Sequence, residues 1–293
     1  MLISLSLLQI WHGLGDRYDA PGLIDLKQDL KSRPNLEGIF VHIVKIGMDG
    51  ASDQSVSASP PPSPLSLSSR SLLIRAGRVK CRKATFFGNA NQQIELVCQQ
   101  LRAIPEIMDE SLNPSGRFDA IGFSQGGQLL RGVIERCGGE GKGKGGLNVR
   151  NLITLGSQHV STLYTLLLCI LLRINADLLA PLDQMGISAL PPCPPDSSIF
   201  SPCRLMHLSL VHSSIYSSYA QNNIVPAQYF RNYENSEELD KYLNGESFLR
   251  DLNNERVGDR QSLSQADTGS VERNQTYKEN FERLDKLVLF RFS

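Results

Sequence analysis

The sequence has no excess of charge and no long apolar run, and each of these absences excludes a class of function. Among its 293 residues, 30 Lys and Arg balance 30 Asp and Glu, so the chain carries no electrostatic footprint for nucleic acid. The most apolar stretch, within residues 161–184, extends for about ten residues, well short of the ~20 that a membrane helix needs. We expect neither a nucleic-acid partner nor a transmembrane span.

Histidine is scarce, and the positions of its five copies do not suggest a metal site. His207 and His212 lie five residues apart, a spacing that does not align them on one face of a helix. His42 lies in an apolar segment, residues 39–43, where a structural histidine with satisfied hydrogen bonds is the usual finding. We expect no metal and no other cofactor.

The most informative motif is Gly-Phe-Ser-Gln-Gly at residues 122–126. It matches Gly-x-Ser-x-Gly, the nucleophile elbow that raises a serine hydroxyl above the sheet of an α/β-hydrolase. Residues 118–123 form a mainly apolar run typical of a buried parallel strand, and apolar residues recur at helical spacing from Leu129 to Cys137. This succession of strand, turn and helix predicts that Ser124 is a nucleophile in acyl transfer rather than an ordinary turn serine.

A glycine-rich turn near the N-terminus supplies a second part of the same chemistry. Residues 7–11 have the pattern of a strand and run into His-Gly-Leu-Gly-Asp at residues 12–16, a turn that can place a backbone N–H in an oxyanion hole. We expect Leu14 and Gln125 to contribute their backbone N–H groups. His12 is expected to shape the turn rather than to act as a base, because in this fold the base follows the serine along the chain.

The order of the remaining patterns favours one α/β domain over residues 1–293. Further strands are expected at residues 39–44 and 151–155, and further helices at residues 23–31 and 91–101. Strand and helix patterns alternate along the chain, as a parallel sheet demands. We predict an α/β-hydrolase fold, with a mostly parallel central sheet and helices on both faces.

Several blocks resemble, in the same order, the signature sequences of palmitoyl-protein thioesterases. The blocks are Trp-His-Gly-Leu-Gly-Asp at residues 11–16, Gly-Phe-Ser-Gln-Gly-Gly-Gln-Leu-Leu-Arg at 122–131, Gly-Ser-Gln-His at 156–159 and Leu-Pro-Pro-Cys-Pro at 190–194, followed by residues 228–231, 248–256 and 274–292. The resemblance implies a hydrolase that cleaves the thioester between a long-chain fatty acid and a protein cysteine through a serine acyl-enzyme. The implied partners are palmitoylated proteins or peptides and long-chain acyl thioesters. The implied location is the lysosome or the secretory pathway, although we expect no cleavable signal peptide in residues 1–6.

The resemblance also implies covalent modifications. Four cysteines match family positions that form two disulfides, Cys98 with Cys137 and Cys193 with Cys203. From the residues alone, a buried free thiol is the alternative for each of them. If the pairs form, the protein matures in an oxidising compartment. Asn274 begins the sequon Asn-Gln-Thr and matches a glycosylation position of the family.

Two stretches lie outside the family pattern, and we interpret them as insertions translated from introns. Residues 51–82 are rich in Ser and Pro and are too polar to bury a core, so we expect them to be disordered. Residues 161–184 separate two segments that resemble the family and have no counterpart in it.

The family places the acid and the histidine of its catalytic triad after a strand that residues 286–292 resemble. On this resemblance the triad Asp and His are absent from this chain, the fold is incomplete at its C-terminus, and we expect little or no activity. His159, which follows the strand expected at residues 151–155, is a candidate surrogate base. Two alternatives stay open: a catalytically dead hydrolase-like fragment that binds acyl chains, and a general serine esterase or lipase, because Gly-x-Ser-x-Gly does not distinguish thioesters from oxyesters.

Overall fold

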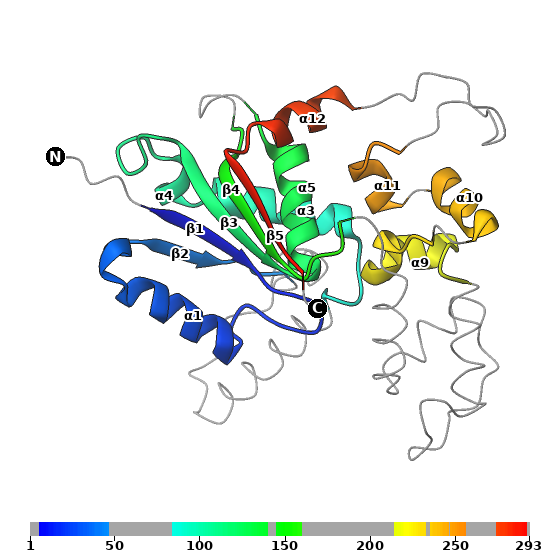
Figure 1. The fold of residues 1–293 in the computed structure, drawn as a ribbon, viewed down its shortest axis with the longest axis horizontal. Coiled ribbons are helices and arrows are strands. Elements are labelled where there is room, and N and C mark those ends of the chain that lie inside the picture. The colour runs from blue at the N-terminus through cyan, green and yellow to red at the C-terminus, as the bar shows by residue number, and fades with distance from the viewer. Residues whose placement is uncertain are drawn as a thin grey trace, which may run out of the picture. The chain divides into compact units, whose positions relative to one another are not determined.

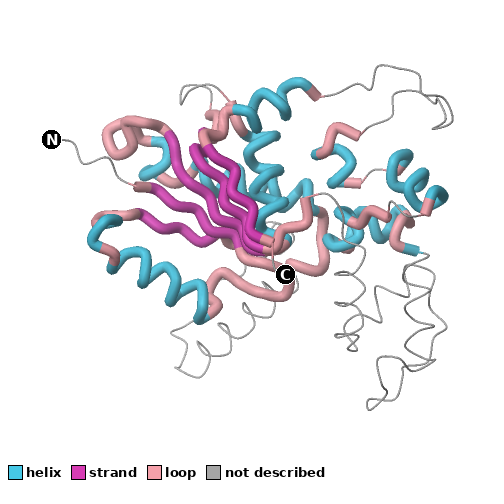
Figure 2. Tube along the Cα trace, viewed as in Figure 1, coloured by secondary structure: helices cyan, strands magenta, loops and turns pink. Residues whose placement is uncertain are grey.

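The strands expected from the sequence assemble into one parallel sheet (Figures 1 and 2). The computed structural model describes residues 6–46, 84–139, 145–159, 214–232, 235–245, 247–255 and 274–291. Its strands are β1 (Leu7–Trp11), β2 (Phe40–Ile43), β3 (Arg117–Phe123), β4 (Asn148–Leu155) and β5 (Lys286–Phe290), which pair in the order β2-β1-β3-β4-β5. Each of these pairings is parallel, so the carboxyl ends of the strands meet at one edge of the sheet. The predicted α/β fold is confirmed.

The chain divides into two compact bodies. The first comprises Met1–Phe87, Gln92–Ser157 and Thr276–Ser293 and contains the sheet, and the second comprises Gly88–Asn91 and Gln158–Gln275. The two expected insertions, at residues 51–82 and 161–184, lie outside the described residues. A single domain over the whole chain stays a prediction.

Helices cover both faces of the sheet, as predicted. On one face, α1 (Pro21–Ser32) packs against Leu8 and Ile10 of β1 and against the apolar side chains of β2. On the other, α5 (Gln125–Cys137) packs against β3, β4 and β1 (Figure 1). The five residues of β1 are buried because both faces of this strand are covered. The strand that leads into the glycine-rich turn is thus fixed in the centre of the first body.

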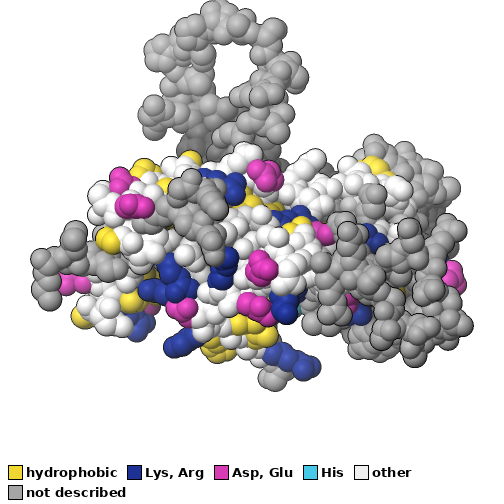
Figure 3. Space-filling view, turned by 90° about the horizontal axis from the view of Figure 1, so that it is seen from above, with side chains coloured by type: hydrophobic (Ala, Val, Ile, Leu, Met, Phe, Trp, Pro, Cys, Tyr) yellow, Lys and Arg dark blue, Asp and Glu magenta, His cyan; other side chains and the backbone are white. Residues whose placement is uncertain are grey.

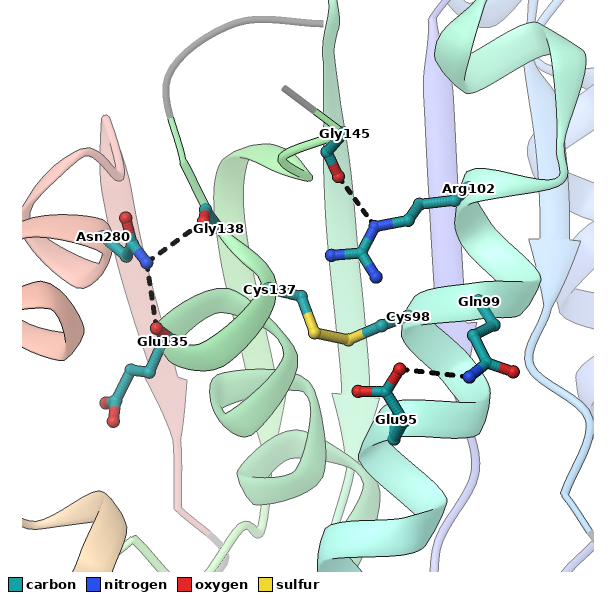
Figure 4. The surroundings of a disulfide bond; sticks show 9 residues. All are labelled: Glu95, Cys98, Gln99, Arg102, Glu135, Cys137, Gly138, Gly145 and Asn280. Atoms are coloured by element: carbon teal, nitrogen blue, oxygen red, sulfur yellow. Dashed lines mark hydrogen bonds between the residues drawn. A yellow bond between two sulfur atoms is a disulfide. The ribbon is translucent and has the colours of Figure 1, made fainter. Parts of the chain in front are cut away.

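A disulfide joins α5 to α3 (Ala90–Arg102), and Figure 4 shows the two helices side by side around it. The bond links Cys98 to Cys137 across a Cα–Cα distance of 6.2 Å. Both cysteines are buried. The predicted pairing of these two residues is confirmed, whereas Cys193 and Cys203 lie outside the described part of the chain.

The C-terminal end of α5 is also closed by a side chain from α12 (Gln275–Glu282). Asn280 Nδ2 donates to the carbonyl of Glu135 at 2.9 Å and to that of Gly138 at 3.2 Å (Figure 4). The last carbonyls of a helix have no partner within it, so this amide satisfies groups that would otherwise be buried without a hydrogen bond. The segment that leads into β5 therefore also completes α5.

The second body contains several short helices, and hydrogen bonds of the buried Gln228 in η5 connect some of its segments. Gln228 accepts a hydrogen bond from the Ala90 N–H at 2.7 Å and donates to the Gly88 carbonyl at 2.8 Å. Ser247 Oγ donates to the Gln228 carbonyl at 2.8 Å. The helices of this body are α9 (Ser218–Asn223), η5 (Val225–Tyr229), α10 (Ser236–Asn244) and α11 (Phe248–Leu252), and the first body also contains η1 (Pro34–Leu36) and α4 (Pro105–Met108).

The described surface shows neither a membrane span nor a region of one charge sign on the face that Figure 3 presents. Among the described residues, no helix is long and apolar enough to cross a bilayer. In Figure 3 the described Lys and Arg side chains are interspersed with Asp and Glu. The mixed charges agree with the balanced composition of the sequence.

His42 has a structural place between β1 and β2, as the sequence suggested. It lies opposite Gln9 in the strand register, and its Nδ1–H donates to Gln9 Oε1 at 2.8 Å. Burial lowers the pKa of His42 to about 4, and the charges of Lys45 and Lys27 act in the same direction. The ring is therefore neutral in the folded protein at neutral pH.

Loss of the disulfide should lower the free energy of unfolding by about 2–4 kcal/mol, because the bond constrains an unfolded chain in which the two cysteines are 39 residues apart. The measurement is urea denaturation of the double variant Cys98→Ala/Cys137→Ala beside the wild type. In a reducing buffer the two proteins should differ by less than about 1 kcal/mol, which isolates the bond from the change of side chain. Equal urea midpoints under oxidising conditions would contradict a stabilising role.

Stability should fall as the pH drops from about 6.5 to about 4, because the unfolded chain takes up a proton on His42 that the folded ring does not accept. The difference in pKa corresponds to at most about 3 kcal/mol in the free energy of unfolding. This stability is fully present above pH 6.5 and is lost as the pH falls towards 4. Urea denaturation at several pH values should show a flatter profile for His42→Asn than for the wild type. Parallel profiles would show that His42 is accessible to protons in the fold.

Candidate active site

Ser124 lies at the turn between β3 and α5, in the strained backbone conformation of a nucleophile elbow. Its φ is 49° and its ψ is −120°. A conformation of this kind costs on the order of 1–3 kcal/mol, so the surrounding structure has to impose it. The Ser124 N–H donates to the Leu155 carbonyl at 2.7 Å, and the Gly127 N–H donates to the Ser124 carbonyl at 3.1 Å. The predicted succession of strand, turn and helix is therefore present, with the turn held by backbone hydrogen bonds within itself and to the end of β4.

Close backbone packing around Ser124 requires the glycines of the motif. A Cβ on Gly122 would lie 2.2 Å from the Gly127 Cα, and a Cβ on Gly126 would lie 2.4 Å from the Trp11 carbonyl oxygen. A Cβ on Gly127 would lie 2.0 Å from Ser157 Oγ. Real side chains do not tolerate contacts of this length. The end of β1, the start of α5 and the segment after β4 thus meet at the elbow without room for another carbon atom.

The turn at residues 12–16 lies against the elbow. A Cβ on Gly13 would be 3.2 Å from the Ser124 Cβ and 3.3 Å from the Phe123 carbonyl oxygen. On the other side of Ser124, Gln125 opens α5, and the N–H groups in the first turn of a helix have no partner within the helix. The structure therefore brings Ser124 together with both segments that were expected to form the oxyanion hole.

The turn is ordered by hydrogen bonds to the Gly13 carbonyl. This oxygen accepts from the Asp16 N–H at 3.3 Å and from His12 Nδ1 at 3.2 Å. By contrast, no described residue accepts a hydrogen bond from the Leu14 N–H. A fixed turn with one unengaged N–H beside the serine has the form of half an oxyanion hole. The role of Leu14 and Gln125 as donors stays a prediction.

His12 is a buried, neutral part of the turn. Its side chain is almost completely inaccessible to solvent. Burial lowers the pKa of His12, although the hydrogen bond to Gly13 and the charge of Asp16 oppose that shift. Because Nδ1 donates to a carbonyl, it carries the ring proton. A neutral imidazole bound to its own loop agrees with the expectation that His12 shapes the turn.

The family model described as palmitoyl protein thioesterase matches residues 8–293, which is nearly the whole chain. This chain belongs to the palmitoyl-protein thioesterase family. The match includes the turn at residues 12–16, the elbow, the disulfide and β5, and it confirms the resemblance found in the sequence blocks.

Two relatives in this family are similar to the chain at modest identity. Palmitoyl-protein thioesterase-dolichyl pyrophosphate phosphatase fusion 1 of Schizosaccharomyces pombe (strain 972 / ATCC 24843) is 27% identical over 250 residues, which cover 85% of this chain and 28% of the relative. Palmitoyl-protein thioesterase 1 of Caenorhabditis elegans is 24% identical over 284 residues, which cover 97% of this chain and 65% of the relative. The chain therefore spans less than two thirds of the length of either relative.

No described side chain forms a hydrogen bond with Ser124 Oγ. His159 belongs to the second body, and its role as a surrogate base stays a prediction.

His207 and His212 lie outside the described residues, and the described part of the chain holds no group of three or more potential metal ligands. Asn274 is exposed just before α12, and its glycosylation stays a prediction.

Thr85 is a residue of the site that the sequence did not indicate. Its Oγ1 accepts a hydrogen bond from the Gly15 N–H at 2.8 Å, and its carbonyl accepts one from Gln125 Nε2 at 3.2 Å. No motif contains Thr85, and it lies three residues after the stretch that we interpret as an insertion. Only the folded contacts, which bridge separations of 70 and 40 residues, reveal its position.

The strain at Ser124 gives a test of the elbow that does not depend on activity. Ser124→Ala keeps the Cβ in a conformation with φ 49°, whereas Ser124→Gly removes it. Relief of strain exceeds the added entropy of the unfolded glycine chain, so the Gly variant should be about 1 kcal/mol more stable than the Ala variant. Urea denaturation measures the difference. A Gly variant no more stable than the Ala variant would show that the backbone at Ser124 is relaxed.

Proposed function

We propose that this chain is a palmitoyl-protein thioesterase that uses Ser124 as its nucleophile. The observation that carries the proposal is the position of Ser124, held at a strained elbow with the turn of residues 12–16 against it, in a member of this family. Proposed substrates are palmitoylated proteins or peptides and other long-chain acyl thioesters. The names of the two relatives, each of which includes palmitoyl-protein thioesterase, support this choice of substrate.

The proposed reaction forms and then hydrolyses an acyl-enzyme. Ser124 Oγ attacks the thioester carbonyl carbon, and the backbone N–H groups of Leu14 and Gln125 stabilise the negative charge that develops on the carbonyl oxygen. Collapse of the tetrahedral intermediate breaks the carbon–sulfur bond and releases the cysteine of the substrate. A thiol, with a pKa near 8.5, leaves with less protonation than an amine requires. Water then attacks the ester on Ser124 and releases the fatty acid.

The serine proton needs an acceptor within roughly 2.6–3.2 Å of Ser124 Oγ. His12 does not meet this requirement, because its Nδ1 donates to the Gly13 carbonyl and its Nε2, the nitrogen able to accept a proton, is buried without a hydrogen-bond partner and so is not bound to Ser124 Oγ. His42 is bound to Gln9 within the sheet. The acceptor is therefore not one of the described histidines of the first body.

The compartment in which the protein matures follows from the disulfide. Bonds such as Cys98–Cys137 form in oxidising environments and are rare in the cytosol. This observation supports the lysosomal or secretory location that the family resemblance implies. Glycosylation of Asn274 would take place on the same route.

The test compares an S-palmitoylated peptide with a p-nitrophenyl ester of the same acyl chain. Thioester turnover should be slow, because no described histidine of the first body is bound to Ser124 Oγ, but it should exceed ester turnover and fall to the background rate in Ser124→Ala. Ser111→Ala is the matched control, since Ser111 bonds to Asp109 on an exposed turn.

Two other results would each support another function. Preference for the oxyester, lost in Ser124→Ala, would indicate a general serine esterase or lipase. Binding of a palmitoyl chain without turnover of either substrate would indicate a hydrolase-like protein that binds acyl groups. The elbow geometry alone does not decide among these three, because Gly-x-Ser-x-Gly is common to thioesterases, esterases and lipases.

A further inference from the structure

The segment ahead of α3 connects the two halves of the proposed oxyanion hole. Thr85 Oγ1 binds the N–H of Gly15, the residue after Leu14. The Thr85 carbonyl binds the side-chain amide of Gln125, the residue expected to supply the second donor. One residue thus binds the glycine-rich turn through its side chain and the start of α5 through its backbone.

The hydrogen bond between Thr85 and Gln125 is buried, and the one between Thr85 and Gly15 is partly buried. Thr85 and Gln125 are each 1% exposed. The Phe86 ring lies beneath Gly15, where a Cβ would be 3.5 Å from Phe86 Cε2. The side chain of Thr85 is buried, so its hydrogen bond competes less with water, and the β-branched Thr side chain has few rotamers. The Gly15 N–H is therefore held in one place.

The segment that carries Thr85 is itself anchored to the core of the first body. Gln93 Nε2, on α3, donates to the Ala84 carbonyl at 2.7 Å. The disulfide in turn joins α3 to α5, the helix that begins with Gln125 (Figure 4). Thr85 therefore rests on the same framework that positions the elbow, and its bond to Gly15 ties the turn to that framework.

The two proposed donors come from distant parts of the chain, so their relative position has to be maintained by packing between segments. Leu14 follows β1, whereas Gln125 follows β3. Hydrogen bonds of an oxyanion hole lower the barrier only when the donors are fixed about 2.7–3.1 Å from the developing charge. The peptide before Leu14 is fixed by the bonds to the Gly13 carbonyl, and the peptide after it is fixed by Thr85.

We propose that Thr85 is a positioning residue that holds the Leu14 and Gln125 N–H groups in register for the oxyanion. This inference rests on the proposed thioesterase function. Thr85 touches neither the serine nor the substrate in this role. It acts through the turn and through Gln125. Its hydroxyl is the group that holds the turn, because the hydroxyl oxygen accepts the hydrogen bond from the Gly15 N–H.

The first test separates binding from turnover. Thr85→Val keeps the shape of the side chain and removes the hydroxyl, whereas Thr85→Ser keeps the hydroxyl and removes the methyl group. With an S-palmitoylated peptide, Thr85→Val should lower kcat by about 10- to 100-fold and change KM by less than about twofold, since a misplaced donor affects the transition state. Thr85→Ser should restore kcat to within about threefold of the wild type.

The second test reads the hydrogen bond itself and does not require activity. Amide hydrogen exchange of the peptide that covers residues 12–16 should accelerate at least about tenfold in Thr85→Val and stay at the wild-type rate in Thr85→Ser. Ile107→Val, a small loss of buried volume on α4, controls for general destabilisation and should leave both this exchange and kcat unchanged.

The outcomes distinguish the two proposals. A wild-type chain that does not hydrolyse the thioester contradicts the proposed function, and the exchange rates then decide alone whether Thr85 holds the turn. An active wild type with unchanged kcat in Thr85→Val contradicts the positioning role and leaves the function standing. Unchanged exchange at residues 12–16 in Thr85→Val also overturns the inference. Equal losses in the Val and Ser variants would assign the effect to packing instead of the hydroxyl.

Discussion

Direct contact between two stretches of backbone, the end of β1 and the first turn of α5, is the constraint on which the rest of the site depends. Gly126 approaches the carbonyl oxygens of Trp11 and His12 so closely that no Cβ fits between them. The strand register places Trp11 beside Gly122 at the same level of the sheet. The distance between the glycine-rich turn and Ser124 is therefore set by main chain against main chain, which is stiffer than any contact through side chains.

The parts of the structure that depend on local sequence could be predicted, and those that depend on long-range contacts could not. The glycines around Ser124, the apolar run before it and the helical spacing after it lie within about twenty residues, and together they specify strand, turn and helix. Thr85 carries no such local signal, because its partners lie 70 and 40 residues away. Asn280 is a similar case: its amide closes α5 only because the chain returns to that helix 145 residues later.

The helix α5 is restrained at both ends by different kinds of interaction. At its start the glycines allow the backbone of β1 to approach, and at its end Cys137 is bonded to α3 while Asn280 binds the final carbonyls. The pairing of Cys98 with Cys137 was correctly inferred from family resemblance, whereas the cysteine spacing alone left several pairings open. A helix fixed in this way transmits little motion to the serine that precedes it.

The position of β5 has a consequence for how the protein is made. Four strands of the sheet come from residues before 156, while β5 begins at Lys286 and pairs with β4, with Lys286 opposite Asn151. As the chain leaves the ribosome, the first four strands can pair while β4 still has an open edge, and that edge waits for most of the second body to be synthesised. An unpaired edge strand is a template for association with other chains. The nascent chain is thus most vulnerable to aggregation through this edge in the interval between the synthesis of β4 and that of β5.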